Sequence, residues 1–199
     1  MKNDRKIYIV ASYTDTWPGR LIVVRAKFKF WNRYDGDTYS HISISQDPEL
    51  TKMYSFARRT IHNPFNAGLI QESIKAGMFA RKPDVNRMAV FELALSEERW
   101  KQLETLINAD WNKRDMLKFN YLGIVVQLIF ARGVARKGHY FCSQWVASQL
   151  NYCGVDLFHK NPVHVRPFDF YVALKDSLIY EGLVKDYCPS LSISEAEAR

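Results

Sequence analysis

The fold of this chain is decided by the stretch Tyr140-Phe141-Cys142-Ser143-Gln144-Trp145-Val146, which places a thiol where a loop turns into a helix. Upstream, Gly133, Gly138 and the basic residues between them are typical of a loop. Downstream, apolar residues recur at helical spacing until Gly154, which predicts a helix that begins near Cys142.

The predicted position of Cys142 has a chemical consequence. The first turn of a helix carries unpaired backbone N–H groups and the positive end of the helix dipole, and both favour a thiolate. Cys142 is therefore a candidate nucleophile. The alternative is a small buried apolar residue at a helix start, because free cysteine is among the most buried residue types.

Length and composition predict one globular domain over residues 1–189, followed by a polar tail at residues 190–199. Of the 199 residues, 47% are hydrophobic and 14% aromatic, which is enough to build a core. The longest apolar stretch, residues 122–131, is interrupted by Gln127, so we expect no membrane span. The charged N-terminus lacks a signal-peptide cleavage pattern, and we therefore expect a cytoplasmic protein.

The three cysteines predict free thiols rather than a disulfide framework. On one helix, Cys142 and Cys153 would lie about 16 Å apart, too far to form a bridge. No spacing of cysteine or histidine resembles a zinc site, so we expect neither a metal nor an organic cofactor.

The formal net charge of +7 raises the question of an anionic partner. Basic residues gather within residues 20–33 and again within residues 132–137, close to Cys142. A solvated face explains either cluster more simply than an anionic partner does. No nucleic-acid-binding motif accompanies the charge, so nucleic acid is not the expected partner. The sequence does not define the oligomeric state.

The periodicity of the chain predicts an α+β fold, with a small antiparallel sheet packed against helices. We predict strands at residues 7–13, 39–45, 52–57 and 87–95, and a terminal strand or hairpin within 178–187. The predicted helices are an amphipathic one at 20–30, a turn at 71–76 ended by Gly77, a helix capped by Ser96, a buried helix at 119–130 and a short helix at 168–175.

Residues 39–45 alternate cleanly between apolar and polar side chains, with Ile42 on one face and His41 on the other. If the following hairpin is symmetric about Pro48, His41 faces Ser55 and Ile42 faces Tyr54. The hydroxyl of Ser55 could then orient the imidazole. A structural histidine and an ordinary strand serine are the alternatives.

With these positions in hand, the chain resembles the circularly permuted branch of the NlpC-type papain-like superfamily of bacterial cysteine amidases and peptidases. In that branch a strand histidine precedes a cysteine that begins a helix. The resemblance spans residues 7–155 and rests on the stretch around Cys142 and on Tyr39-Ser40-His41-Ile42-Ser43-Ile44. Met53-Tyr54-Ser55-Phe56 and Phe119-Asn120-Tyr121-Leu122-Gly123 are also similar to bacterial members.

The resemblance implies a permuted papain-like fold in which Cys142 is the nucleophile and His41 its general base. Many relatives place His, Asn or Gln where the hairpin argument places Ser55. The candidates for a substrate or oxyanion pocket are Tyr140, Ser143 and Glu72, of which Tyr140 and Glu72 also have plain structural interpretations.

Three functions remain open from the sequence. The first is a thiol hydrolase that cleaves an amide, isopeptide or ester bond of a small acylated or peptide substrate through an acyl-thioester. The second is a thioester acyltransferase, similar to the lecithin retinol acyltransferase relatives. The third is a catalytically silent module that binds an anionic ligand in the same cleft.

Overall fold

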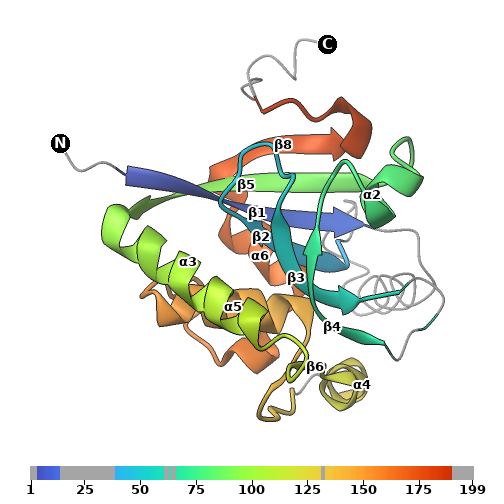
Figure 1. Cartoon of the computed structure of the whole chain (residues 1–199), viewed down its shortest axis with the longest axis vertical. Coiled ribbons are helices and arrows are strands. Elements are labelled where there is room, and N and C mark those ends of the chain that lie inside the picture. Colours follow the sequence, from blue (N-terminus) through green and yellow to red (C-terminus); the bar gives the residue numbers. More distant parts are fainter. Residues whose placement is uncertain (1–3, 14–38, 61–62, 64–65, 131–132, 190–199) are drawn as a thin grey trace.

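A computed structural model describes residues 4–13, 39–60, 63, 66–130 and 133–189 of the chain. It is an α+β structure built on a six-stranded sheet in which neighbouring strands are antiparallel, in the order β4-β3-β2-β1-β5-β8 (Figure 1). The strands are β1 (Asp4–Tyr13), β2 (His41–Ser45), β3 (Met53–Arg58), β4 (Ala67–Glu72), β5 (Arg87–Ser96) and β8 (Leu178–Leu183). A separate parallel pair is formed by β6 (Lys118–Phe119) and β7 (His139–Tyr140).

The central strand β1 is buried on both faces, which explains its nearly continuous apolar sequence. It pairs with β5 along its whole length, from Asp4 opposite Ser96 to Tyr13 opposite Arg87. Alternate residues of β1 enter two different hydrophobic clusters, one on each side of the sheet.

Helices α3 (Glu97–Asn112) and α5 (Cys142–Tyr152) lie side by side on one face of the sheet (Figure 1). Trp145 of α5 is fully buried in the larger cluster, which also takes side chains from α6 (Pro167–Ala173). The smaller cluster on the other face includes side chains of α2 (Gly77–Arg81) and of the 3-10 turn Val184–Asp186. Two further 3-10 turns, Pro162–His164 and Lys175–Ser177, lie on either side of α6 in the sequence.

The structure confirms most of the predicted elements. β1, β2, β3, β5 and β8 lie at the predicted strands, and α3, α5 and α6 at the predicted helices. The start of α3 has the expected chemistry, because the Ser96 side chain accepts a hydrogen bond from the Arg99 backbone N–H and two glutamates occupy the first turn.

One prediction of secondary structure is wrong. Residues 71–76 do not form a helical turn, because Gln71 and Glu72 end the edge strand β4, and Gly77 begins α2 instead of ending a helix. Gly77 has a φ of +63°, a backbone conformation that favours glycine.

The helix predicted as buried is α4 (Tyr121–Phe130), and its described side chains are largely exposed. Leu122 and Val125 each keep 49% of their surface in solvent. The uniformly apolar sequence suggested burial all round, whereas among residues 121–126 of the helix only Gly123 is buried. The predicted helix at residues 20–30 and the tail at 190–199 lie outside the described residues.

Candidate active site at the start of α5

The position of Cys142 is set by the entry into α5. Strand β7 ends at Tyr140, and Cys142 begins the helix two residues later. The backbone N–H of Trp145 closes the first turn by donating to the Phe141 carbonyl at 2.9 Å. The thiol is free and only 9% of Cys142 is exposed. The sequence-based prediction of a thiol in the first turn of a helix is therefore confirmed.

Two side chains anchor α5 to α3. Trp145 Nε1 and Gln149 Nε2 both donate to the same oxygen of Asp110, Oδ2, at 2.8 and 2.9 Å. Hydrogen bonds to a charged acceptor are stronger than neutral ones, so this pair holds the helix that carries Cys142 at a fixed distance from α3.

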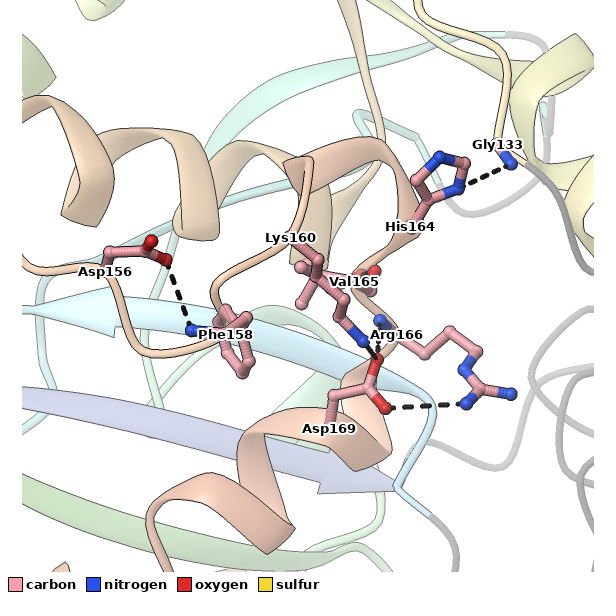
Figure 2. A network of polar contacts seen from close by, with 9 residues as sticks. Gly133, Asp156, Phe158, Lys160, His164, Val165, Arg166 and Asp169 are labelled. Atoms are coloured by element: carbon pink, nitrogen blue, oxygen red, sulfur yellow. Dashed lines mark hydrogen bonds and ion pairs between the residues drawn. The ribbon is translucent and has the colours of Figure 1, made fainter.

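A second set of polar contacts fixes the segment that follows α5. Figure 2 shows Asp169 between Lys160 and Arg166, with Lys160 Nζ and the Arg166 backbone N–H both donating to Asp169 Oδ2 at 2.7 Å. In the same view, His164 Nδ1 accepts from the Gly133 N–H at 3.0 Å, which joins this segment to the loop before α5. The loop before α5 and the segment after α5 are thus joined to each other by hydrogen bonds.

The imidazole of His41 contacts a carboxylate and lies close to the thiol. Its Nε2 lies 2.9 Å from Oε2 and 3.1 Å from Oε1 of Glu72, which ends the edge strand β4. Cys142 also helps to raise the pKa of His41, so its thiol lies close to the imidazole.

The electrostatics of this group favour a charged pair. Burial alone would lower the pKa of His41, but the charge of Glu72 and hydrogen bonds with Cys142 and Glu72 raise it well above 6.5. Burial would raise the pKa of Glu72, yet the charge of His41 and hydrogen bonds from His41 and Ser43 hold it below its ordinary value. Near neutral pH the pair is therefore an imidazolium and a carboxylate.

Ser43 completes the network and was not singled out from the sequence. Its buried hydroxyl donates to Glu72 Oε2 at 2.6 Å and lies 3.3 Å from His41 Nε2. The available signal was its position two residues after His41, because alternate residues of a strand project to the same face.

The structure places Glu72, and not Ser55, against the imidazole. The hairpin pairs Ile44 with Tyr54, whereas the symmetric turn predicted Ile42 opposite Tyr54. Asp47 causes the difference, because its carboxylate accepts from the backbone N–H groups of Glu49 and Thr51 and centres the turn one residue later.

When the turn is centred one residue later, the partner of each β3 residue on β2 shifts by two residues. Each side chain then stays on the same face of the sheet but lies opposite a different residue. Ser55 is fully buried, and its hydroxyl donates to the carbonyl oxygen of Ile42. The assigned pairs of the ladder between β2 and β3 are Ile44 with Tyr54 and Ser45 with Met53, at the far end of β2 from His41. α5 packs against both strands.

The other two predicted pocket residues have structural contacts. Ser143 is fully buried, and its hydroxyl donates to the Val165 carbonyl at 2.7 Å. Tyr140 is half-buried, with its ring centroid 5.4 Å from that of Phe56, and burial raises the pKa of its phenol. Its carbonyl accepts from the Asn120 N–H at 2.9 Å, so both residues help to fix the approach to Cys142.

Among the described residues, no group of three or more His, Cys, Asp or Glu side chains is arranged to hold a metal ion. In the same part of the chain, no helix is both long and apolar enough to cross a membrane.

Comparison with known proteins gives no identification: no family model, no curated protein and no solved structure matches the chain. The site is therefore interpreted from its own residues.

Proposed function

We propose that the chain is a thiol hydrolase that cleaves an amide, isopeptide or ester bond, with Cys142 as nucleophile, His41 as general base and Glu72 as the residue that orients His41. The observation that carries the proposal is the imidazole of His41, which is only 12% exposed, contacts the Glu72 carboxylate and lies close to the Cys142 thiol. A cysteine nucleophile is activated when a buried carboxylate orients an imidazole and the imidazole in turn takes the proton of the thiol.

The proposed fold assignment is the circularly permuted papain-like one. Its support is the order of the parts, with the histidine strand β2 before the cysteine helix α5, and the packing of α5 against β2 and β3. Glu72 takes the third position of the proposed site, for which the sequence suggested Ser55.

In the proposed reaction, the imidazolium of His41 already holds the proton of Cys142, and the thiolate sulfur attacks the carbonyl carbon of the substrate. Backbone N–H groups at the start of α5 stabilise the oxyanion. The tetrahedral intermediate collapses to an acyl-thioester, and the leaving amine or alcohol takes the proton from His41. Water, deprotonated by His41, then attacks the thioester, which releases the acid and restores the thiolate.

The arrangement explains why Glu72 is ionised at this position. Its charge stabilises the imidazolium that forms when the thiol gives up its proton, and its two oxygens fix the ring plane through Nε2. A serine at this position would hold the ring less firmly and supply no charge.

Trapping of the acyl-thioester with an activated ester, 4-nitrophenyl acetate, tests the proposal without knowledge of the natural substrate. We expect acetyl on Cys142, located by peptide mass spectrometry, and its release by neutral hydroxylamine, which cleaves thioesters. In Cys142→Ser the hydroxylamine-sensitive acetyl should disappear, whereas Cys153→Ala and Cys188→Ala should retain it. Acetylation of Cys188 or of lysines without acetylation of Cys142 would contradict the proposal.

A further inference from the structure

The helix α4 presents an apolar surface to solvent. Large apolar side chains that are exposed are few among the described residues, and four of the seven lie between residues 116 and 125. Leu122 and Val125 lie three positions apart on α4, and Tyr121 precedes them on the same side. We call these three residues the α4 surface. An exposed apolar surface of this kind marks an interaction site.

The orientation of α4 is fixed from the protein side. Asn120 is fully buried; its Oδ1 accepts from the Gly123 N–H at 3.0 Å, and its Nδ2 donates to the Val134 carbonyl at 2.9 Å. A Cβ at Gly123 would lie 2.3 Å from the Asn120 side chain, so glycine leaves room for this buried residue at the start of the helix. Gly123 and Asn120 are buried, whereas Leu122 and Val125 are each 49% exposed.

In the sequence, basic residues both precede and follow the α4 surface. Residues 113–140 contain six lysines and arginines and a single acidic residue, Asp115, and so carry five of the seven net positive charges of the chain. The carboxylate of Asp115 is itself paired with Arg59 at 3.1 Å. Between residues 119 and 131 there is no charged residue at all.

The small parallel sheet brings these cations close to α4. Lys118 lies in β6, three residues before α4, and its backbone N–H donates to the Gly138 carbonyl at 2.8 Å. Lys137 precedes that glycine, and both lysines are exposed, as is Arg136. An apolar stripe with lysine and arginine beside it fits a surface that is anionic outside and apolar beneath, which is a lipid bilayer with acidic headgroups.

We propose that the α4 surface docks on anionic lipid bilayers, with Leu122, Val125 and the ring of Tyr121 among the acyl chains and Lys118, Arg136 and Lys137 against the headgroups. The ten residues of α4 make a helix about 15 Å long, half of what a span requires, so it lies in the interface. The proposal does not depend on the chemistry at Cys142.

Vesicle co-sedimentation of the full chain tests this docking. We expect binding to vesicles of phosphatidylcholine mixed with phosphatidylglycerol, and much weaker binding to phosphatidylcholine alone or at high salt. Leu122→Gln with Val125→Gln should lower the partition coefficient about tenfold. The matched control is Val85→Gln with Val172→Gln, which changes two valines that are 51% and 54% exposed elsewhere and should bind like the wild type.

The charge contribution is tested separately. Lys118→Gln and Lys137→Gln should each weaken binding to the mixed vesicles about fivefold, more than Lys75→Gln or Lys101→Gln, which remove the same charge elsewhere. Thermal unfolding checks that each variant is folded. Three results would overturn the proposal: no vesicle binding by the wild type, equal losses in test and control variants, or a dimer in analytical ultracentrifugation that the Leu122 and Val125 changes dissociate without any effect on vesicle binding.

Discussion

The two ends of α5 each carry a buried cysteine, and the two thiols have opposite surroundings. Cys142 at the first turn lies close to His41, whose pKa is raised by the charge of Glu72. Cys153 follows the last turn, where its Sγ donates to the Leu150 carbonyl at 3.1 Å and burial raises the pKa of its thiol.

This difference shows that burial alone does not decide the reactivity of a cysteine. Both thiols are shielded from water, but one lies at the positive end of the helix dipole beside a cation and the other at the negative end beside a carbonyl oxygen. The rate of alkylation of each thiol, read by mass spectrometry in one sample, therefore compares the two environments directly.

Removal of the imidazole should change the difference in alkylation rate between Cys142 and Cys153 more than any other substitution. In His41→Ala we expect the alkylation rate of Cys142 near neutral pH to fall on the order of 100-fold, because the thiol loses its proton acceptor, with no change at Cys153. At alkaline pH hydroxide can remove the thiol proton instead, so the loss of alkylation rate should be smaller. His159→Ala, at a largely exposed histidine, is the control. An unchanged Cys142 rate would show that His41 does not activate the thiol.

The buried pair of His41 and Glu72 should make stability depend on pH. The raised pKa of His41 gives stabilisation that is complete below its ordinary value of 6.5 and is lost as pH rises through the folded value. The lowered pKa of Glu72 gives stabilisation that is present above its ordinary value of 4.5 and is lost as pH falls through the folded value. Both contributions are complete between pH 4.5 and 6.5.

Glu72→Gln should accordingly lower the free energy of unfolding by about 3 kcal/mol in this window and by less at higher and lower pH. Denaturant titrations at a series of pH values measure the difference, with Glu104→Gln on the exposed side of α3 as the control. A difference that does not vary with pH would mean that the two groups are not coupled.

Glu72→Gln should also reduce the advantage of Cys142 over Cys153, by about tenfold near neutral pH. The amide can still accept a hydrogen bond from His41, but it supplies no charge to keep the imidazole protonated. The same alkylation assay measures the ratio. If the ratio of the two alkylation rates is the same in Glu72→Gln as in the wild type, the carboxylate has only a structural role.

A smaller effect distinguishes the two buried serines near His41. Ser43→Ala removes a hydrogen bond to Glu72 and should slow alkylation of Cys142 about threefold, whereas Ser55→Ala removes a bond to the Ile42 carbonyl and should leave the rate unchanged. Ser43→Thr, which keeps the hydroxyl, should restore the rate. The reverse order of effects would favour Ser55 as the orienting residue.

The elements of this fold follow from local patterns. The alternation around His41 and the Ser96 cap before α3 are set by neighbours in sequence, and the predicted elements agree with the structure. The thiol at the start of α5 was predictable for the same reason, because the change from loop to helical periodicity lies within one short stretch.

The partner of His41 was not predictable in this way. It depends on where the turn around Asp47 is centred and on β4, an edge strand whose sequence Ala67-Gly68-Leu69-Ile70-Gln71-Glu72 has little alternation. The exposure of α4 was missed because an apolar helix has the same sequence whether another protein segment or solvent lies beside it. Long-range register and the surroundings of a surface are properties of the assembled chain.

The proposal that His41 activates Cys142 is tested most directly by the alkylation rates of all three cysteines of the wild type, measured in one sample near neutral pH. Cys188 is exposed and Cys142 is buried, so accessibility alone would make Cys188 the faster. We expect Cys142 to react at least about tenfold faster than Cys188, with Cys153 the slowest. If Cys142 reacts more slowly than Cys188 and as slowly as Cys153, the imidazole does not activate it and the proposed hydrolase is wrong.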